Sequence, residues 1–207
     1  MSGTKRTGKV KETDDYNKPG RDFKEVLTNY KKYTTSFEFK TFLGIPIIAS
    51  IIVFSTFLLI DISNAELLRI VIDMNSDALT VIAILAGFNT TSLAIIAASN
   101  SSVLKFLRQH TVENGDGTLL KQLVSFFSFA ILIQLIVLIG GLILEVISNS
   151  FSGIASSFSF LSGLAVTIPL SLLGALWLGA ILFTIIISLR NATLLYRYVL
   201  FVADYDE

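Results

Sequence analysis

Residues 79–98, LTVIAILAGFNTTSLAIIAA, decide the fold of this chain. The hydrocarbon core of a bilayer is about 30 Å thick and needs roughly 20 helical residues to cross it. The stretch has that length and no charged residue, yet it carries Asn89, Thr90 and Thr91 at its centre. A carboxamide is costly among acyl chains without a hydrogen-bond partner. The stretch therefore predicts a central helix of a transmembrane bundle, with Asn89 facing another helix.

The same stretch has a second face made of small residues. Side chains no larger than threonine recur there every three or four positions, at Ala83, Gly87, Thr91, Ala94 and Ala98. Small residues let two membrane helices approach closely. Because Asn89 lies on the opposite side, we expect protein to cover both faces of this helix.

The composition supports membrane insertion. Hydrophobic residues make up 53% of the chain and charged residues only 15%, whereas charged residues are about a quarter of an ordinary soluble domain. Without cysteine the chain offers no disulfide, haem attachment or thiol chemistry. The polar lead of about forty residues is too long for the first region of a signal peptide, so we expect the first apolar run to be retained.

Hydropathy divides the chain into a cytoplasmic lead, four spans and a tail, and predicts an all-α, four-helix transmembrane bundle with short cytoplasmic helices. We expect spans at 41–60, 78–99, 123–147 and 161–189, a disordered N-terminal tail at 1–20, an amphipathic juxtamembrane helix at 21–40 and a cytoplasmic C-terminal tail at 190–207 that continues the last helix for two or three turns.

The connecting segments carry their own expectations. Residues 61–76 predict a short helix lying in the outer interface, and the second span is expected to continue into the cytoplasm through Val103 and Leu107. Residues 148–160, without charge, predict a flexible outer loop or an interfacial segment. Pro169 is expected to bend the fourth span or to separate a short outer piece from it.

Charge distribution predicts the orientation. Ten of the sixteen Lys and Arg precede Thr41, and Arg69 alone lies in a predicted outer segment. Basic residues concentrate on the cytoplasmic side of membrane proteins. Both termini are therefore expected in the cytoplasm, which agrees with an even number of spans.

Polar groups inside the spans predict two contacts. Asn89 and Gln134 lie at similar depths in the second and third spans, so we expect a hydrogen bond between them, acting either as glue or as part of a polar passage or latch. Glu145 is the one ionisable residue within a span. It either pairs with Arg69 near the outer surface or reaches headgroup water.

The fourth span carries a groove of small residues at four-residue intervals: Gly163, Thr167, Ser171, Ala175 and Gly179. Such a groove predicts the closest helix contact in the protein or its oligomer. It packs either against the small face of the second span or against another subunit.

No catalytic pattern appears in the sequence. His110 is the only histidine, and the acidic residues lack the spacing of metal ligands or paired catalytic carboxylates. We therefore expect no enzymatic activity, no cofactor, no metal and no nucleic-acid partner. The absence of ionisable residues near the bilayer centre also argues against proton-coupled transport.

The segment AGFNTTSLAIIAASNSS at 86–102, with the four spans and the basic lead, resembles small four-span membrane proteins of prokaryotes, some of which are membrane partners in anti-phage operons. The resemblance implies a protein that senses or perturbs the inner membrane while a separate cytosolic protein supplies any enzymatic activity. We expect a sensor or effector that engages such a partner through 21–40, 100–122 or 190–207, and that forms a homo-oligomer. The alternative is a homo-oligomeric pore.

Overall fold

The computed structural model describes residues 20–60, 62–111, 117–152 and 164–205, and within these ranges the chain is helical, with no strand longer than an isolated bridge. The predicted all-α class is therefore confirmed. The predicted disordered tail lies outside the described residues, apart from Gly20, as does most of the predicted outer loop. The helices are α1 (Arg21–Tyr33), α2 (Ser36–Leu59), α3 (Asn64–Ala97), α4 (Ser101–Gln109), α5 (Leu119–Ser152) and α6 (Leu164–Tyr205).

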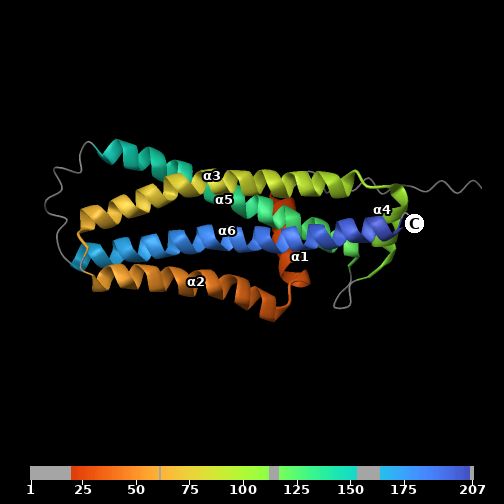
Figure 1. Ribbon diagram of the computed structural model, residues 1–207, viewed down its shortest axis with the longest axis horizontal. Helices are drawn as coiled ribbons and strands as arrows, with labels where there is room; N and C mark the ends of the chain where they lie inside the picture. Colours follow the sequence, from red (N-terminus) through yellow and green to blue (C-terminus); the bar gives the residue numbers. More distant parts are fainter. Residues whose placement is uncertain (1–19, 61, 112–116, 153–163, 206–207) are drawn as a thin grey trace, which may run out of the picture.

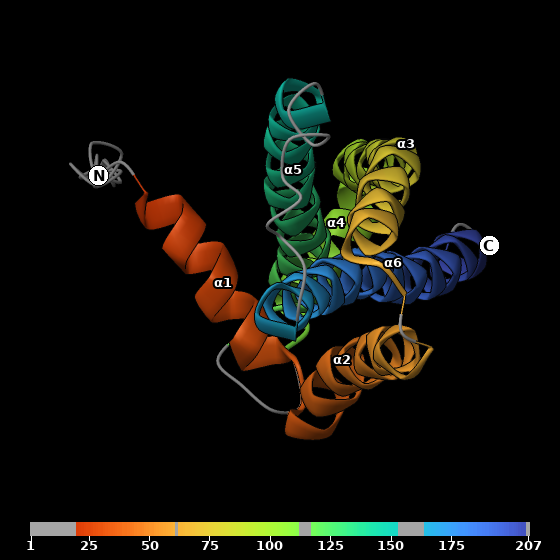
Figure 2. The same cartoon turned by 90° about the vertical axis from the view of Figure 1, so that its left-hand side faces the viewer.

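Four of these helices, α2, α3, α5 and α6, are long and apolar enough to cross a membrane. They run side by side along the long axis of the molecule, with α6 in contact with α2, α3 and α5 (Figures 1 and 2). The α2–α3 connection lies at one end and α4 with the end of α6 at the other, whereas α1 lies part of the way along the bundle, beside the start of α2. The chain is a polytopic membrane bundle.

α1 is shorter than the juxtamembrane helix predicted at 21–40. α1 ends at Tyr33, and a new helix begins at Ser36 because Thr35 forms a capping box: its side chain accepts from the Glu38 backbone N–H, and the Glu38 carboxylate accepts from the Thr35 N–H. Residues 36–40 therefore belong to the first membrane helix. α1 points away from the bundle at a steep angle (Figure 2), as an interfacial helix does.

The expected interface helix at 61–76 is not a separate element. Ser63 caps α3 by accepting from the Glu66 backbone N–H at 3.3 Å, and the helix then runs unbroken through Ala97. The expected extension beyond this helix is also wrong, because the chain turns after Ala98 and Asn100 caps a new helix, α4. The Ser63 cap therefore starts α3 earlier in the chain than predicted, and the Asn100 cap begins a separate helix where a continuation of α3 was predicted.

The last helix is longer than expected. α6 contains Pro169 without interruption and extends over 42 residues to Tyr205, or about 63 Å at 1.5 Å per residue. That is twice the thickness of a hydrocarbon core. Its C-terminal part packs with α4 in a cluster that contains Val103, Leu107 and Tyr198, so this end of the bundle is folded.

The small-residue groove of α6 packs against α2 and the outer part of α3. Ser171, Ala175 and Gly179 are buried, and Thr167 donates to Asn64 Oδ1 at 2.7 Å. Gly163 lies outside the described residues. The contact is within the chain, as one interpretation held, but it does not involve the small face around Gly87.

The closest approach along this groove is at Gly174, which the four-residue pattern omitted. A Cβ atom added there would lie 2.2 Å from Phe54 Cε1, against 3.3 Å from Ser50 Oγ for one added at Gly179. Phe54 is buried in a cluster with Leu67, Val71 and Ala175. This aromatic ring therefore needs a glycine opposite it.

Candidate functional site

A cluster of polar side chains lies at the centre of the bundle. Asn89 of α3 donates through Nδ2 to Gln134 Oε1 of α5 at 3.1 Å and to Ser188 Oγ of α6 at 3.1 Å. Gln134 Nε2 donates to the same Ser188 oxygen at 2.5 Å. The predicted hydrogen bond between Asn89 and Gln134 is confirmed, and a hydroxyl of the last span completes it.

Asn191, one turn further along α6, closes the cluster. Its Nδ2 donates to Asn89 Oδ1 at 2.9 Å and to the Phe126 carbonyl at 3.4 Å. Asn89, Gln134 and Asn191 are each 0% exposed. A buried polar network is stable when its donors and acceptors are paired, and here Asn191 Oδ1 alone lacks a partner among the described residues.

The polar cluster is therefore sealed by its own packing. It joins α3, α5 and α6, and its members Asn89, Gln134, Ser188 and Asn191 are at most 2% exposed. The sequence analysis did not predict Ser188 and Asn191 as members of this cluster. The signal that could have found them is the spacing of Thr184, Ser188 and Asn191, which places three polar residues on one face of the last span.

Beside this polar cluster, Arg190 of α6 contacts residues of α1, α2 and α5. Its guanidinium lies 3.9 Å from the centre of the Phe126 ring, 5.4 Å from that of Phe42 and 5.9 Å from that of Tyr30. Its NH2 atom contacts Glu38 Oε2 at 3.4 Å. The Arg190 side chain is only 10% exposed, so the aromatic rings replace water around the cation.

The ring of Tyr30 anchors α1 in this aromatic cage. It stacks on Phe129 with ring centres 3.6 Å apart and meets Phe126 edge-on. Burial raises the pKa of the Tyr30 hydroxyl, although the Arg190 charge opposes the shift. Further out on α1, a hydrogen bond and ion pair with Lys121 of α5 lower the pKa of Glu25.

A smaller polar contact lies near the other end of the bundle. Asn75 of α3, which is buried, donates through Nδ2 to the Gly141 carbonyl at 3.1 Å and to Glu145 Oε2 at 3.2 Å. Arg69 instead contacts Asp73 Oδ2, one turn away, at 3.5 Å. The predicted pair of Arg69 with Glu145 is therefore wrong, because each group has a nearer polar partner.

Among the described residues, none packs against the small face of α3. Ala83, Gly87, Thr90 and Thr91 are exposed, and a Cβ atom added at Gly87 would meet nothing within 4 Å. The expectation of protein on both sides of this helix fails for the single chain. Thr90 and Thr91 therefore do not share an environment with buried Asn89.

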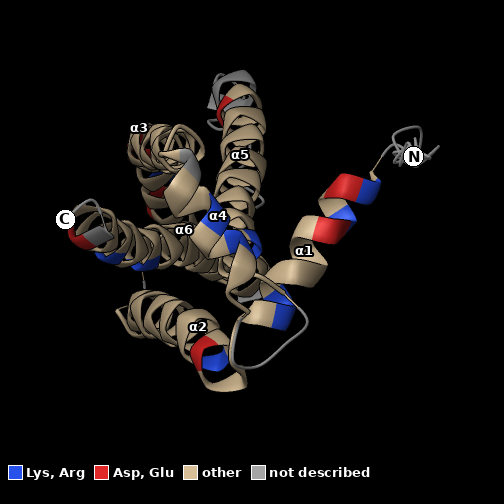
Figure 3. Cartoon of the chain, turned by 90° about the vertical axis from the view of Figure 1, so that its right-hand side faces the viewer, with Lys and Arg blue, Asp and Glu red and all other residues tan. Residues whose placement is uncertain are grey.

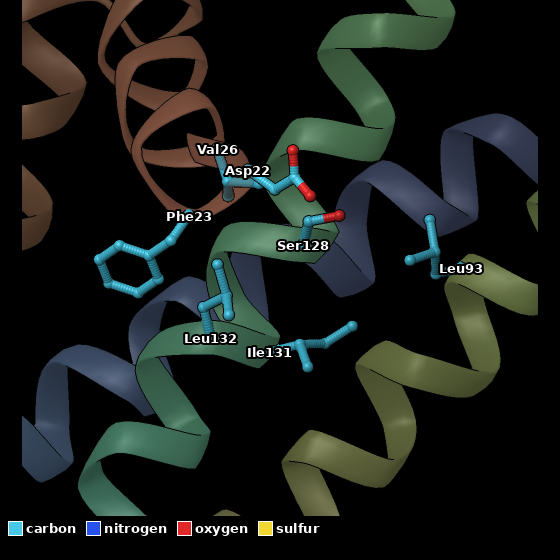
Figure 4. Close-up of a pocket in the computed structure, with 7 residues that line it drawn as sticks. All are labelled: Asp22, Phe23, Val26, Leu93, Ser128, Ile131 and Leu132. Carbon is cyan, nitrogen blue, oxygen red and sulfur yellow. The ribbon is translucent and has the colours of Figure 1, made fainter. Parts of the chain in front are cut away.

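A shallow groove of about 360 Å³ lies where α1 leaves the bundle (Figure 4). Its lining is mostly aliphatic and aromatic, from Phe23, Val26, Leu93, Ile131 and Leu132, with Asp22 and Ser128 as its polar members. Across the described ranges no group of three His, Cys, Asp or Glu is placed to hold a metal ion. The groove offers apolar surface and no evident catalytic group.

Comparison with known proteins adds no relative: no protein-family model, curated protein or solved structure matches this chain.

Proposed function

We propose that this protein is a non-enzymatic membrane sensor or effector that engages a cytosolic protein partner. The observation that carries the proposal is the adjacency of Arg190 and Asn191. Arg190 holds α1 and α2, whereas Asn191 belongs to the polar cluster that joins α3, α5 and α6. A displacement of α1 therefore acts on the same turn of α6 that orders the membrane core.

The partner surface that we propose consists of the exposed side of α1, α4 and the C-terminal part of α6. Figure 3 looks onto this end of the bundle, where the charged residues gather. On α1 the exposed side carries both signs, with Asp22 and Glu25 among Lys24, Lys31 and Lys32. Mixed charge suits a protein partner better than a nucleic acid, which favours a uniformly basic surface.

The orientation supports a cytosolic partner. Among the described residues Arg69 is the sole basic side chain at the end opposite α1, and the positive-inside rule then places α1 and both termini in the cytoplasm. Reporter fusions after Glu207 and within residues 148–160 test this arrangement. Reporters on the same side, or on reversed sides, would contradict it.

The partner itself is tested by purification from native membranes. We expect a stoichiometric partner with the wild type and with Arg69→Glu, which changes charge at the far end of the bundle. The double variant Lys24→Glu, Lys31→Glu should lose that partner while still inserting in the membrane. Retention of the partner by this double variant would exclude α1 as the docking surface.

A second candidate is a homo-oligomeric pore in the inner membrane of a prokaryote. It is favoured by the polar side chains on the outward side of α3, including Asp73, Thr80 and Thr91, which are exposed although α3 is a candidate span. Polar faces of several subunits can line a passage. Purified protein in liposomes should conduct ions under this candidate and remain silent under the first.

The biological setting that we propose is defence against phage, which rests on the resemblance of residues 86–102 and the four-span layout alone. Plating efficiency of a phage panel on cells with and without the gene and its neighbours tests it. Equal plating across a broad panel would remove this setting and leave the molecular proposal intact.

A further inference from the structure

The outward face of α3 carries a line of small and polar side chains beside exposed aliphatic ones such as Ile84. Nine residues that follow each other in steps of three or four are all exposed, and none is a large aliphatic residue: Arg69, Asp73, Ser76, Thr80, Ala83, Gly87, Thr91, Ala94 and Ala98. We call this set the α3 stripe. At 100° per residue these positions lie within an arc of about 80°, so they form one continuous line along the helix.

The other membrane helices present large aliphatic side chains outward. Examples are Ile48 and Ile52 on α2, Ile139 and Leu142 on α5, and Leu176 on α6, which are between 56% and 64% exposed. Such side chains suit contact with acyl chains. The contrast shows that the α3 stripe is not built as a lipid-facing surface, because hydroxyls and charges gain nothing from lipid.

The charged part of the stripe lies at membrane depth. Val71 of α3 packs with Phe54 of α2, and α2 continues for another turn and a half, to Leu59, beyond this level. Asp73 lies two residues further along α3 than Val71, toward the bilayer centre. Its carboxylate and the Arg69 guanidinium have side chains 65% and 82% exposed, so in a lone chain this ion pair would face the surrounding lipid.

The part of the α3 stripe from Ala83 to Ala98 is suited to close helix contact. In this part of the α3 stripe no side chain exceeds threonine in size, and the space around Gly87 is open. Steps of three and four residues repeat the spacing of helix pairs that cross at a shallow angle. A partner helix can therefore approach here more closely than at any aliphatic face.

We propose that the α3 stripe is covered by the α3 stripe of a second copy of this chain. Copies in one membrane share an orientation, so each position meets its equivalent at the same depth. Equivalent residues of the two copies lie at equal depth, so the charges pair between copies only because the long Arg69 side chain can reach one turn along the helix to Asp73 of the other copy, as it already reaches Asp73 of its own chain at 3.5 Å. The contact closes around Gly87, where the two backbones come nearest.

This inference goes beyond the proposed function and competes with the pore candidate, because an α3 stripe that is closed against its own copy cannot line a passage. Liposome conductance tests the pore, and self-association is measured separately. The Thr90 hydroxyl carries no part of the argument, because it already donates to the Ala86 carbonyl at 2.8 Å.

Cysteine cross-linking tests the contact without background, because the chain contains no cysteine. Single variants Ala83→Cys, Gly87→Cys and Ala94→Cys are oxidised in native membranes beside matched exposed controls, Ile48→Cys and Ile139→Cys. A disulfide forms only when the Cα atoms approach within about 7 Å. We expect a band at twice the mass of 22.7 kDa for the α3 variants, at least tenfold stronger than for the controls.

A second substitution distinguishes loss of the contact between two α3 helices from misfolding of the single chain. Gly87→Leu fits the single chain, since nothing lies within 4 Å of the new Cβ, and Gly44→Leu on α2 is an equally open control. Gly87→Leu should reduce the Ala94→Cys cross-link at least fivefold, and Gly44→Leu should leave it unchanged. Absent α3 cross-links, equal cross-links on all helices, or adducts of a different mass would each overturn the proposal.

Discussion

Replacing Arg190 by lysine isolates the interaction that holds α1 on the bundle. The change keeps the positive charge near Glu38, which is 39% exposed and gives a solvent-screened pair. It removes the planar guanidinium that lies 3.9 Å from the Phe126 ring centre. A lysine ammonium keeps part of the cation–π attraction but cannot stack a planar group on the ring, so a loss of about 1 kcal/mol should raise the undocked population of α1 about fivefold.

Thiol labelling measures that population. Val26 is partly buried against the cluster around Tyr30, and because the chain has no native cysteine, a Val26→Cys background reports undocking through its rate of reaction with a maleimide. Arg197→Lys, an exposed position on the same helix, is the control and should leave the rate unchanged. Equal labelling rates in Arg190→Lys and its parent would refute the role assigned to the aromatic cage.

Three further predictions concern packing, the polar cluster and pH. Gly174→Ala should destabilise the detergent-solubilised protein by about 1–3 kcal/mol through overpacking, whereas Gly44→Ala should be neutral or slightly stabilising because nothing lies within 4 Å of the new Cβ and alanine favours helix; equal melting temperatures would contradict the contact at Gly174. Asn89→Leu should cost about 1–3 kcal/mol because it leaves the Gln134 carbonyl unpaired, and Asn89→Leu with Gln134→Leu should recover part of that loss in a folded protein, which a double-mutant cycle on unfolding detects. The raised pKa of Tyr30 means that the docked state holds the phenolic proton more tightly than the undocked state does. Docking of α1 is therefore fully stable below about pH 10 and weakens as the pH rises above that value. Val26→Cys labelling that rises equally with pH in a Tyr30→Phe background would contradict this.

The spans and the central hydrogen bond could be predicted from the sequence because both depend on local properties, namely the length of an apolar run and the depth of a polar residue within it. An apolar run reports its own length against the bilayer, and two carboxamides at equal depth in lipid have few partners other than each other. The continuity of α3 was harder to predict, since charges within 64–77 suggested an interfacial segment although no residue there breaks a helix.

The remaining contacts depend on how the helices are rotated about their axes. Whether Glu145 meets Arg69 or Asn75 is decided by the packing of α3 against α5, and Asn75 occupies the inward face while Arg69 points out. The aromatic cage around Arg190 draws its rings from three helices, α1, α2 and α5. No local pattern in any one of them indicates that arrangement.

The adjacency of Arg190 and Asn191 makes the length of α6 critical to a single residue. Neighbouring positions on a helix point about 100° apart, so each of the two side chains faces its own set of helices only at one rotation. Deleting or inserting one residue between Gly179 and Arg190 would leave the hydropathy of the span almost unchanged while turning both groups away from their partners. We expect α6 to tolerate exchanges of aliphatic residues in this interval far better than any change in its number of residues.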